Sequence, residues 1–166
     1  NMNTNIERLS QMLKRHFQKL GGVYMLGDTV REGIFEGDRL SGIMTVNHGD
    51  TCFKADNFIL ASGSFFSKGL VSDINGVREP VFGLDVDSLD ERPQWYRKDM
   101  FEAQPYMSFG VATDAGFHPS RNGQPVENLY ATGSVLSNCH PMKEGSGAGV
   151  AILTALHVAD TILKNQ

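Results

Sequence analysis

The sequence predicts an α/β fold with a buried pair of parallel strands, a small antiparallel sheet beside it and helices on the flanks. Two continuous apolar runs, residues 57–61 and 129–132, are typical of strands buried on both faces of a parallel sheet. Shorter runs between Gly and Asp turns in residues 28–55 favour an antiparallel layer. Apolar residues at helical spacing predict helices over residues 5–20 and 147–163, and we expect both to pack on the buried sheet.

The first helix is predicted by a stripe of apolar residues three or four positions apart, with charged residues mostly off the stripe. The stripe consists of Ile6, Leu9, Leu13, Phe17 and Leu20. Thr4 and Glu7 have the spacing of a capping box, and Gly21–Gly22 supplies a stop. These signals indicate an amphipathic surface helix.

The middle of the chain changes to the period of strands. Short strands are expected, in order, at residues 23–26, 29–35, 40–46 and 52–55, before the buried strand 57–61. Residues 64–93 are rich in glycine and polar residues and predict a long ordered loop. A short helix within 93–103 and a strand over 107–112 complete the expected elements before strand 129–132.

Composition excludes several classes of protein. The 166 residues suffice for one domain, and 40% apolar with 20% charged residues is ordinary globular usage. A net charge of -4 and a pI near 5.7 indicate no nucleic-acid partner. Two separate cysteines favour a reducing cytoplasm, and they are too few to hold an iron–sulfur cluster. No apolar run approaches the roughly 20 residues of a membrane span, and no metal-binding motif occurs.

The two buried strands end alike, in Leu60-Ala61-Ser62-Gly63-Ser64 and Tyr130-Ala131-Thr132-Gly133-Ser134. In open α/β sheets, ligands bind beyond the carboxyl ends of the strands. Small residues at that edge let an extended cofactor approach the backbone. Taken alone, either copy equally fits a core strand that ends in a turn.

The last helix begins in a glycine-rich segment, Gly145-Ser146-Gly147-Ala148-Gly149. Free N–H groups and the macrodipole at a helix N-terminus favour a negatively charged or electron-rich group. The segment is not a GxGxxG motif, and close helix packing explains any single glycine equally well. His140, Lys143 and Glu144 precede it, where a general base or a phosphate clamp would be useful.

Residues 128–159, NLYATGSVLSNCHPMKEGSGAGVAILTALHVA, resemble the C-terminal flavin-binding signature of flavoproteins with two dinucleotide-binding domains. Residues 58–70, FILASGSFFSKGL, resemble a strand end of the same superfamily. With the segments 77–80 and 83–86, the likeness narrows to the B subunits of anaerobic glycerol-3-phosphate dehydrogenases. The resemblance implies the C-terminal portion of an FAD/NAD(P)-binding-like fold.

The resemblance also implies a flavin, FAD or FMN, and assigns residues to it. Gly63 would lie near the adenosine half of the cofactor. The flavin end would be lined by Gly133, Ser134, Gly145, Ser146 and Gly147. Catalytic residues are not assigned. The N-terminal unit that bears GxGxxG is absent from this sequence, which also starts with Asn, so we expect residues 1–166 to be one domain from a larger flavoprotein.

By the same resemblance, the enzyme oxidises sn-glycerol 3-phosphate to dihydroxyacetone phosphate and passes electrons to the quinone pool, whereas this piece alone is expected to be inactive. The implied partners are a catalytic subunit and a membrane-anchoring iron–sulfur subunit, which would hold the chain peripherally on the cytoplasmic side of the inner membrane. Two alternatives remain open: a non-catalytic electron-transfer or assembly subunit, and a fumarate-reductase-like flavoprotein. The long loop offers Phe65 and Phe66 for a partner surface, or for packing against a preceding segment.

Overall fold

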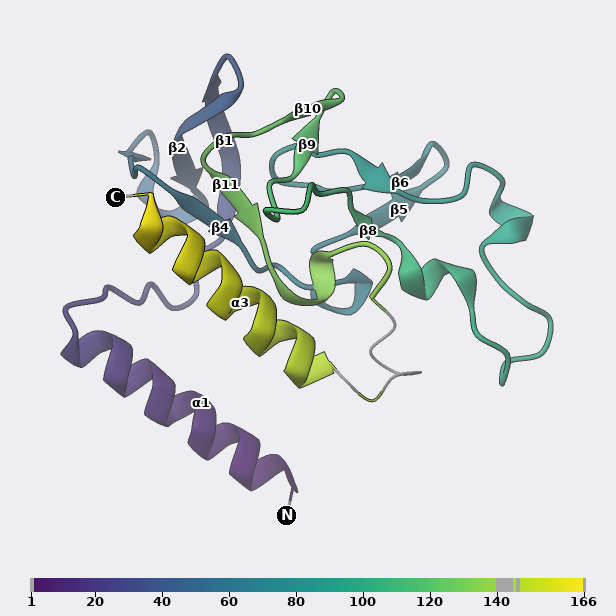
Figure 1. Ribbon diagram of the computed structural model, residues 1–166, viewed down its shortest axis with the longest axis horizontal. Coiled ribbons are helices and arrows are strands. Elements are labelled where there is room, and N and C mark those ends of the chain that lie inside the picture. The colour runs from purple at the N-terminus through teal and green to yellow at the C-terminus, as the bar shows by residue number, and fades with distance from the viewer. Residues whose placement is uncertain (1, 140–144, 146, 166) are drawn as a thin grey trace.

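A computed structural model describes residues 2–139, 145 and 147–165 (Figure 1). The two long helices are α1 (Met2–Lys19) and α3 (Gly147–Lys164). The strands of the first half are β1 (Val30–Glu36), β2 (Arg39–Thr45), β3 (Cys52–Phe53), β4 (Phe58–Leu60), β5 (Val71–Asp73) and β6 (Gly76–Arg78). Those of the second half are β7 (Val86–Asp87), β8 (Gly110–Val111), β9 (Ser120–Arg121), β10 (Gln124–Pro125) and β11 (Leu129–Ala131).

The two apolar runs form the expected parallel pair, β4 with β11. Tyr130 lies opposite Ile59, with the neighbouring residues in register on either side. The ladder extends past the strand ends, because the Thr132 amide donates to the Leu60 carbonyl oxygen at 2.9 Å. Both strands therefore deliver their carboxyl ends to one edge, as the sequence predicts.

The separate antiparallel layer is also confirmed, as the sheet β1–β2–β3. The expected strand 23–26 is wrong: these residues form no strand, and Val23 and Leu26 are both 79% exposed. No neighbouring strand in the described part of the chain offers this run a hydrogen-bond ladder, so its apolar character alone does not make it a strand.

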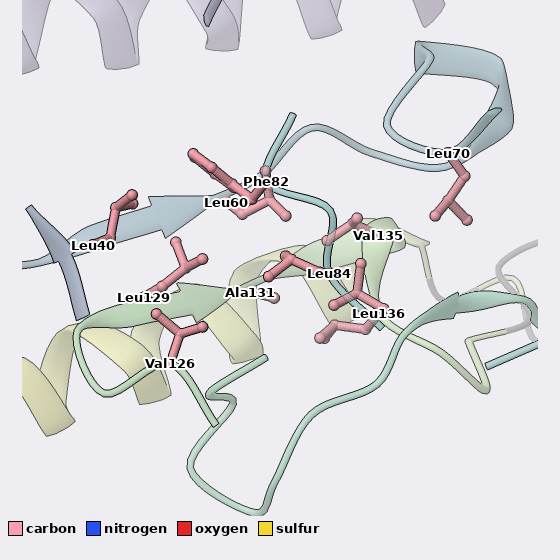
Figure 2. Packing of buried hydrophobic residues seen from close by; sticks show 11 residues of the cluster. Leu40, Leu60, Leu70, Phe82, Leu84, Val126, Leu129, Ala131, Val135 and Leu136 are labelled. Atoms are coloured by element: carbon pink, nitrogen blue, oxygen red, sulfur yellow. The ribbon is translucent and has the colours of Figure 1, made fainter. Parts of the chain in front are cut away.

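The core lies between β2, β4, β11 and the loops that cross them (Figure 2). Its members are Leu40, Leu60, Leu70, Phe82, Leu84, Val111, Val126, Leu129, Ala131, Val135 and Leu136. Figure 2 shows Phe82, Leu84 and Val126 gathered around Leu60, Leu129 and Ala131 of the β4–β11 pair, with Leu70 farther away. The pair is thus the centre of the domain, although only β11 is buried throughout, because Ile59 of β4 is 53% exposed.

Helix α3 packs against a 3-10 turn, η5 (Gly133–Val135), that directly follows β11. Its buried contacts come from Thr154 and Val158, whereas Leu153 and Leu156 stay exposed. By length and composition α3 could cross a membrane, which is weak evidence for a span when the helix also docks on the domain.

The expected packing of the first helix on the sheet is wrong. The apolar stripe of α1 is open, with Leu9, Leu13 and Phe17 exposed by 56%, 62% and 47%. Figure 1 shows α1 lying apart, on the side of α3 away from β11. The helix forms from its own periodicity, and its apolar face is only partly covered, by Tyr24 beside Leu13 and Phe17.

The region 64–112 holds more structure than a loop. It contains the hairpin β5–β6 and the pair β7–β8. The expected helix in 93–103 is only a 3-10 turn, η3 (Arg92–Gln94). The expected strand 107–112 is shortened to β8, because another 3-10 turn, η4 (Pro105–Ser108), occupies its start. Proline favours the first turn of a helix, which explains why both turns include one.

Candidate functional site

The similar ends of β4 and β11 lie side by side. Since β4 and β11 are parallel and in register, Gly63 and Gly133 leave the same edge of the sheet. A Cβ atom added at Gly63 would lie 3.6 Å from the Ser134 Oγ and 2.8 Å from the Ser67 Oγ. Gly63, Gly133 and Ser134 are therefore brought together, as their shared motif predicts.

Glycine is required by the backbone at both strand ends. The φ angles of Gly63 and Gly133 are +79° and +74°, in the left-handed region that L side chains rarely adopt. Each strand can thus turn sharply at its carboxyl end. The space beside Gly63 is shared with the Ser67 and Ser134 side chains, and Gly133 is buried against Ala151 of α3.

The start of α3 belongs to the same part of the molecule. A Cβ atom at Gly133 would lie 3.7 Å from the Cβ of Ala151, which is one helical turn after Gly147. Gly145 has a φ of +61°, and neither it nor Gly149 would bring an added Cβ within 4 Å of another atom. The glycine-rich entry therefore presents bare backbone and open space beside the strand ends.

Some predicted residues cannot be placed. Ser146 lies outside the described residues, as do His140, Lys143 and Glu144. The predicted set that the structure describes is Gly63, Gly133, Ser134, Gly145 and Gly147.

Two polar residues at this edge were not singled out by the sequence. The Oγ of Ser62 is buried and has no hydrogen-bond partner among the described residues. The Thr154 Oγ1 accepts a hydrogen bond from the Gly133 amide at 3.0 Å. Nothing in the sequence distinguishes Thr154 from Thr161 of the same helix. Nothing in the pattern distinguishes Ser62 from an ordinary turn serine.

A groove of about 720 Å³ runs along β4 and reaches Ser62, Ser67 and Lys68. One wall is the segment Pro80–Phe82, held by the buried carboxylate of Glu79. That carboxylate accepts hydrogen bonds from the amides of Val81 at 2.9 Å and Phe82 at 2.7 Å. The groove has apolar walls and one basic side chain, Lys68, at the strand-end side among the described residues that line it.

The lining of the groove also includes a negative charge, on Asp28. The Asp28 carboxylate binds the Nδ1 of His48 at 2.7 Å. Burial by itself would raise the pKa of Asp28, but hydrogen bonds from the Thr45 side chain, from the Asn47 and Thr29 amides and from His48 outweigh it and lower the pKa to about 2. Asp28 is consequently ionised at neutral pH.

Comparison with known proteins identifies the fold. Residues 3–150 match the FAD binding domain family. The chain belongs to this family. The sequence left the choice between FAD and FMN open, and the family match supports FAD. The comparison with solved structures gives no significant match.

Several curated relatives are similar over nearly the whole chain. The B subunit of anaerobic glycerol-3-phosphate dehydrogenase from Yersinia pseudotuberculosis serotype I (strain IP32953) is 44% identical over 96% of this chain and 38% of its own length. The protein of the same name from Pectobacterium atrosepticum is 45% identical over 95% of this chain and 37% of its own. The chain thus spans little more than a third of the length of these relatives.

The described residues fit an FAD at this edge. Both adjoining strand ends turn at positive-φ glycines, and the glycines at 145 and 149 face open space. The orphaned Ser62 hydroxyl offers a buried hydrogen-bonding group with no other use in the described part of the chain. A flat, polar-edged cofactor matches bare backbone with isolated hydroxyl groups.

Proposed function

We propose that this chain is part of an FAD-dependent dehydrogenase that oxidises sn-glycerol 3-phosphate to dihydroxyacetone phosphate. The observation that carries the proposal is the 44% identity over 96% of the chain to relatives named as the B subunit of an anaerobic glycerol-3-phosphate dehydrogenase. The paired strand ends, built from residues typical of a cofactor edge, support it independently. Bound FAD would take up the hydride that leaves the substrate carbon.

In this proposal the chain holds the flavin end of the cofactor. Gly133, Ser134, Gly145 and Gly147 lie along it, and Gly63 lies towards the adenosine half. The backbone of the two strand ends orients the cofactor, and the N-terminus of α3 places a partial positive charge beside it. Such positioning is what a protein contributes to flavin chemistry.

The pyrophosphate of FAD is held elsewhere in the proposal. No GxGxxG unit occurs in this sequence, and the relatives are much longer than the part that matches. We propose that these 166 residues are one domain of a larger flavoprotein, whose remaining part grips the pyrophosphate and covers the open stripe of α1. The 166-residue chain alone should then be inactive and bind FAD with a Kd above about 1 µM, on the ordinary scale of affinities.

The relatives are named as one subunit of a larger enzyme, which supports partner subunits as well. We propose a catalytic partner and a membrane-anchoring iron–sulfur subunit that passes electrons to quinone, with this chain on the cytoplasmic side of the inner membrane. A non-catalytic role for this chain is favoured by one observation: among the described residues that line the groove, Lys68 is the one basic group available to a phosphate.

The test uses the full-length protein, purified with and without its partners. Flavin absorbance that is bleached by anaerobic addition of glycerol 3-phosphate to the isolated full-length protein would support substrate oxidation here. Bleaching only in the assembled complex would assign the oxidation to a partner. Gly147→Leu should give a folded protein with less FAD, and full flavin content in that variant would contradict the proposed cofactor edge.

A further inference from the structure

Thr154 connects α3 to the end of β11 through a single buried hydroxyl. Its Oγ1 accepts a hydrogen bond from the Gly133 amide at 3.0 Å and donates one to the Val150 carbonyl oxygen at 2.7 Å. The residue is 9% exposed, in a helix whose other described side chains are mostly open to solvent. Both hydrogen-bonding functions of the hydroxyl are thus used.

This bond changes the role of Gly133. An amide at the carboxyl end of a parallel strand is ordinarily available to a ligand. Here the amide of Gly133 is occupied by Thr154, so Gly133 can offer a cofactor space but not a hydrogen bond. The polar group of the strand end is used to hold the helix.

Threonine is a costly choice for the helix itself. It has lower helix propensity than alanine or leucine, and a hydroxyl that bonds the carbonyl four residues back slightly weakens the helix. Thr161 makes the same internal bond, to the His157 carbonyl oxygen at 2.9 Å, but it is only half-buried. The two threonines therefore differ in the tertiary bond, which Thr154 alone makes among the described hydrogen bonds of α3.

The hydrogen bond between Thr154 and the Gly133 amide fixes the position of α3 along its own axis relative to the end of β11. A shift of one residue would move the helix by about 1.5 Å and rotate it by about 100°. Gly147 lies seven residues before Thr154, or about 10 Å along the axis. The start of α3 is consequently set relative to Gly133 and the neighbouring Ser134, which belong to the proposed flavin end.

We propose that Thr154 is a positioning residue for the cofactor: through the Gly133 amide it holds the N-terminus of α3 and the β11 strand end in the relative placement that FAD requires. The inference rests on the proposed function, because the cofactor edge is defined there. Thr154 acts without contact with the reacting atoms.

The test compares variants of the full-length protein. Thr154→Val keeps the shape of the side chain and removes the acceptor, and Thr154→Ala removes it while improving helix propensity. Thr154→Ser retains the hydroxyl. Thr161→Val is the matched control, since it deletes the same internal bond without a tertiary partner. The measurements are FAD affinity, the visible circular dichroism of the bound flavin, and the melting temperature of the FAD-free protein.

Thr154→Val and Thr154→Ala should weaken FAD binding roughly tenfold and alter the flavin circular dichroism, as loss of a bond to a buried amide predicts. Thr154→Ser and Thr161→Val should match the wild type. Unchanged affinity and flavin spectrum in Thr154→Ala, whatever its melting temperature, would overturn the inference and leave Thr154 a structural residue. A wild-type protein that binds no FAD would instead overturn the proposed function.

Discussion

The Asn128 side chain and the Leu40 backbone exchange two hydrogen bonds across 88 residues of sequence. The Asn128 Oδ1 accepts from the Leu40 amide at 2.8 Å, and its Nδ2 donates to the Leu40 carbonyl oxygen at 2.8 Å. The same Nδ2 donates to the Asp56 carbonyl oxygen at 3.1 Å. One buried amide thereby ties the antiparallel layer to the beginnings of β4 and β11.

Replacing Asn128 with alanine should therefore destabilise the protein. The substitution leaves the buried Leu40 amide and carbonyl without their partner, at a cost of about 2–3 kcal/mol. Urea denaturation measures the loss, and the exposed Asn75→Ala is the control, expected within about 0.5 kcal/mol of the wild type. A loss below about 1 kcal/mol for Asn128→Ala would show that water replaces the amide.

Two glycines of the proposed cofactor edge should respond in opposite ways to alanine. Gly133 has a φ of +74°, so Gly133→Ala should cost about 1–2 kcal/mol of stability although its added Cβ would meet Ala151 only at ordinary van der Waals distance. Gly149 lies in the first turn of α3 with open space around it, so Gly149→Ala should stabilise by up to about 1 kcal/mol. Denaturation of the FAD-free protein checks both, and equal effects would contradict the backbone argument.

The sequence predicts the elements of the domain where a pattern acts locally. The apolar runs around Ile59 and Tyr130 predicted the parallel pair, because apolar composition is typical of buried strands. Burial on both faces is confirmed for β11 and is wrong for β4, where Ile59 is 53% exposed. The stripe of α1 predicted its helix but not its environment, since periodicity marks an apolar face without showing what covers it. The same limit explains the exposed run at Val23.

The candidate site was also predicted only in part from the sequence. The echo between the segments around Gly63 and Gly133 predicted their adjacency, because parallel strands share an edge. Thr154 and Ser62 could not be found, since their roles depend on contacts made only after folding. A glycine at a strand end indicates a turn with positive φ, as found at Gly63 and Gly133. The hydrogen bond from the Gly133 amide to Thr154 of α3 has no such signal in the sequence.

The structure separates the two phenylalanines that were expected at a partner surface. Phe66 is 82% exposed, whereas Phe65 is half-buried and packs edge-on against Tyr106 with ring centroids 6.3 Å apart. Phe66→Asp should leave stability unchanged and weaken the complex with the proposed partner subunits, which co-purification measures. Phe65→Asp should lower stability by about 2 kcal/mol or more, because it buries a charge next to the core. An intact complex in Phe66→Asp would exclude Phe66 from the interface.

The Asp28 carboxylate should make the stability of the protein sensitive to acid. Its side chain is 7% exposed and accepts hydrogen bonds from the Thr29 amide at 2.8 Å and the Asn47 amide at 3.1 Å. Burial alone would raise the pKa of Asp28, but these bonds and those from Thr45 and His48 lower it from 3.8 to about 2. A carboxylate whose pKa is depressed by folding stabilises the folded state above its ordinary pKa.

The sign of the effect fixes the pH range of the test. The stabilisation by Asp28 is fully present above its ordinary pKa of 3.8 and is lost as the pH falls through about 2. Asp28→Asn should therefore be less stable than the wild type at neutral pH, and the difference should shrink between about pH 4 and pH 2. Urea denaturation of both proteins across this range measures the difference, with the exposed Asp50→Asn as the control. A difference that stays constant down to pH 2 would show that the variant loses stability for a reason other than the charge on Asp28, and would contradict the lowered pKa.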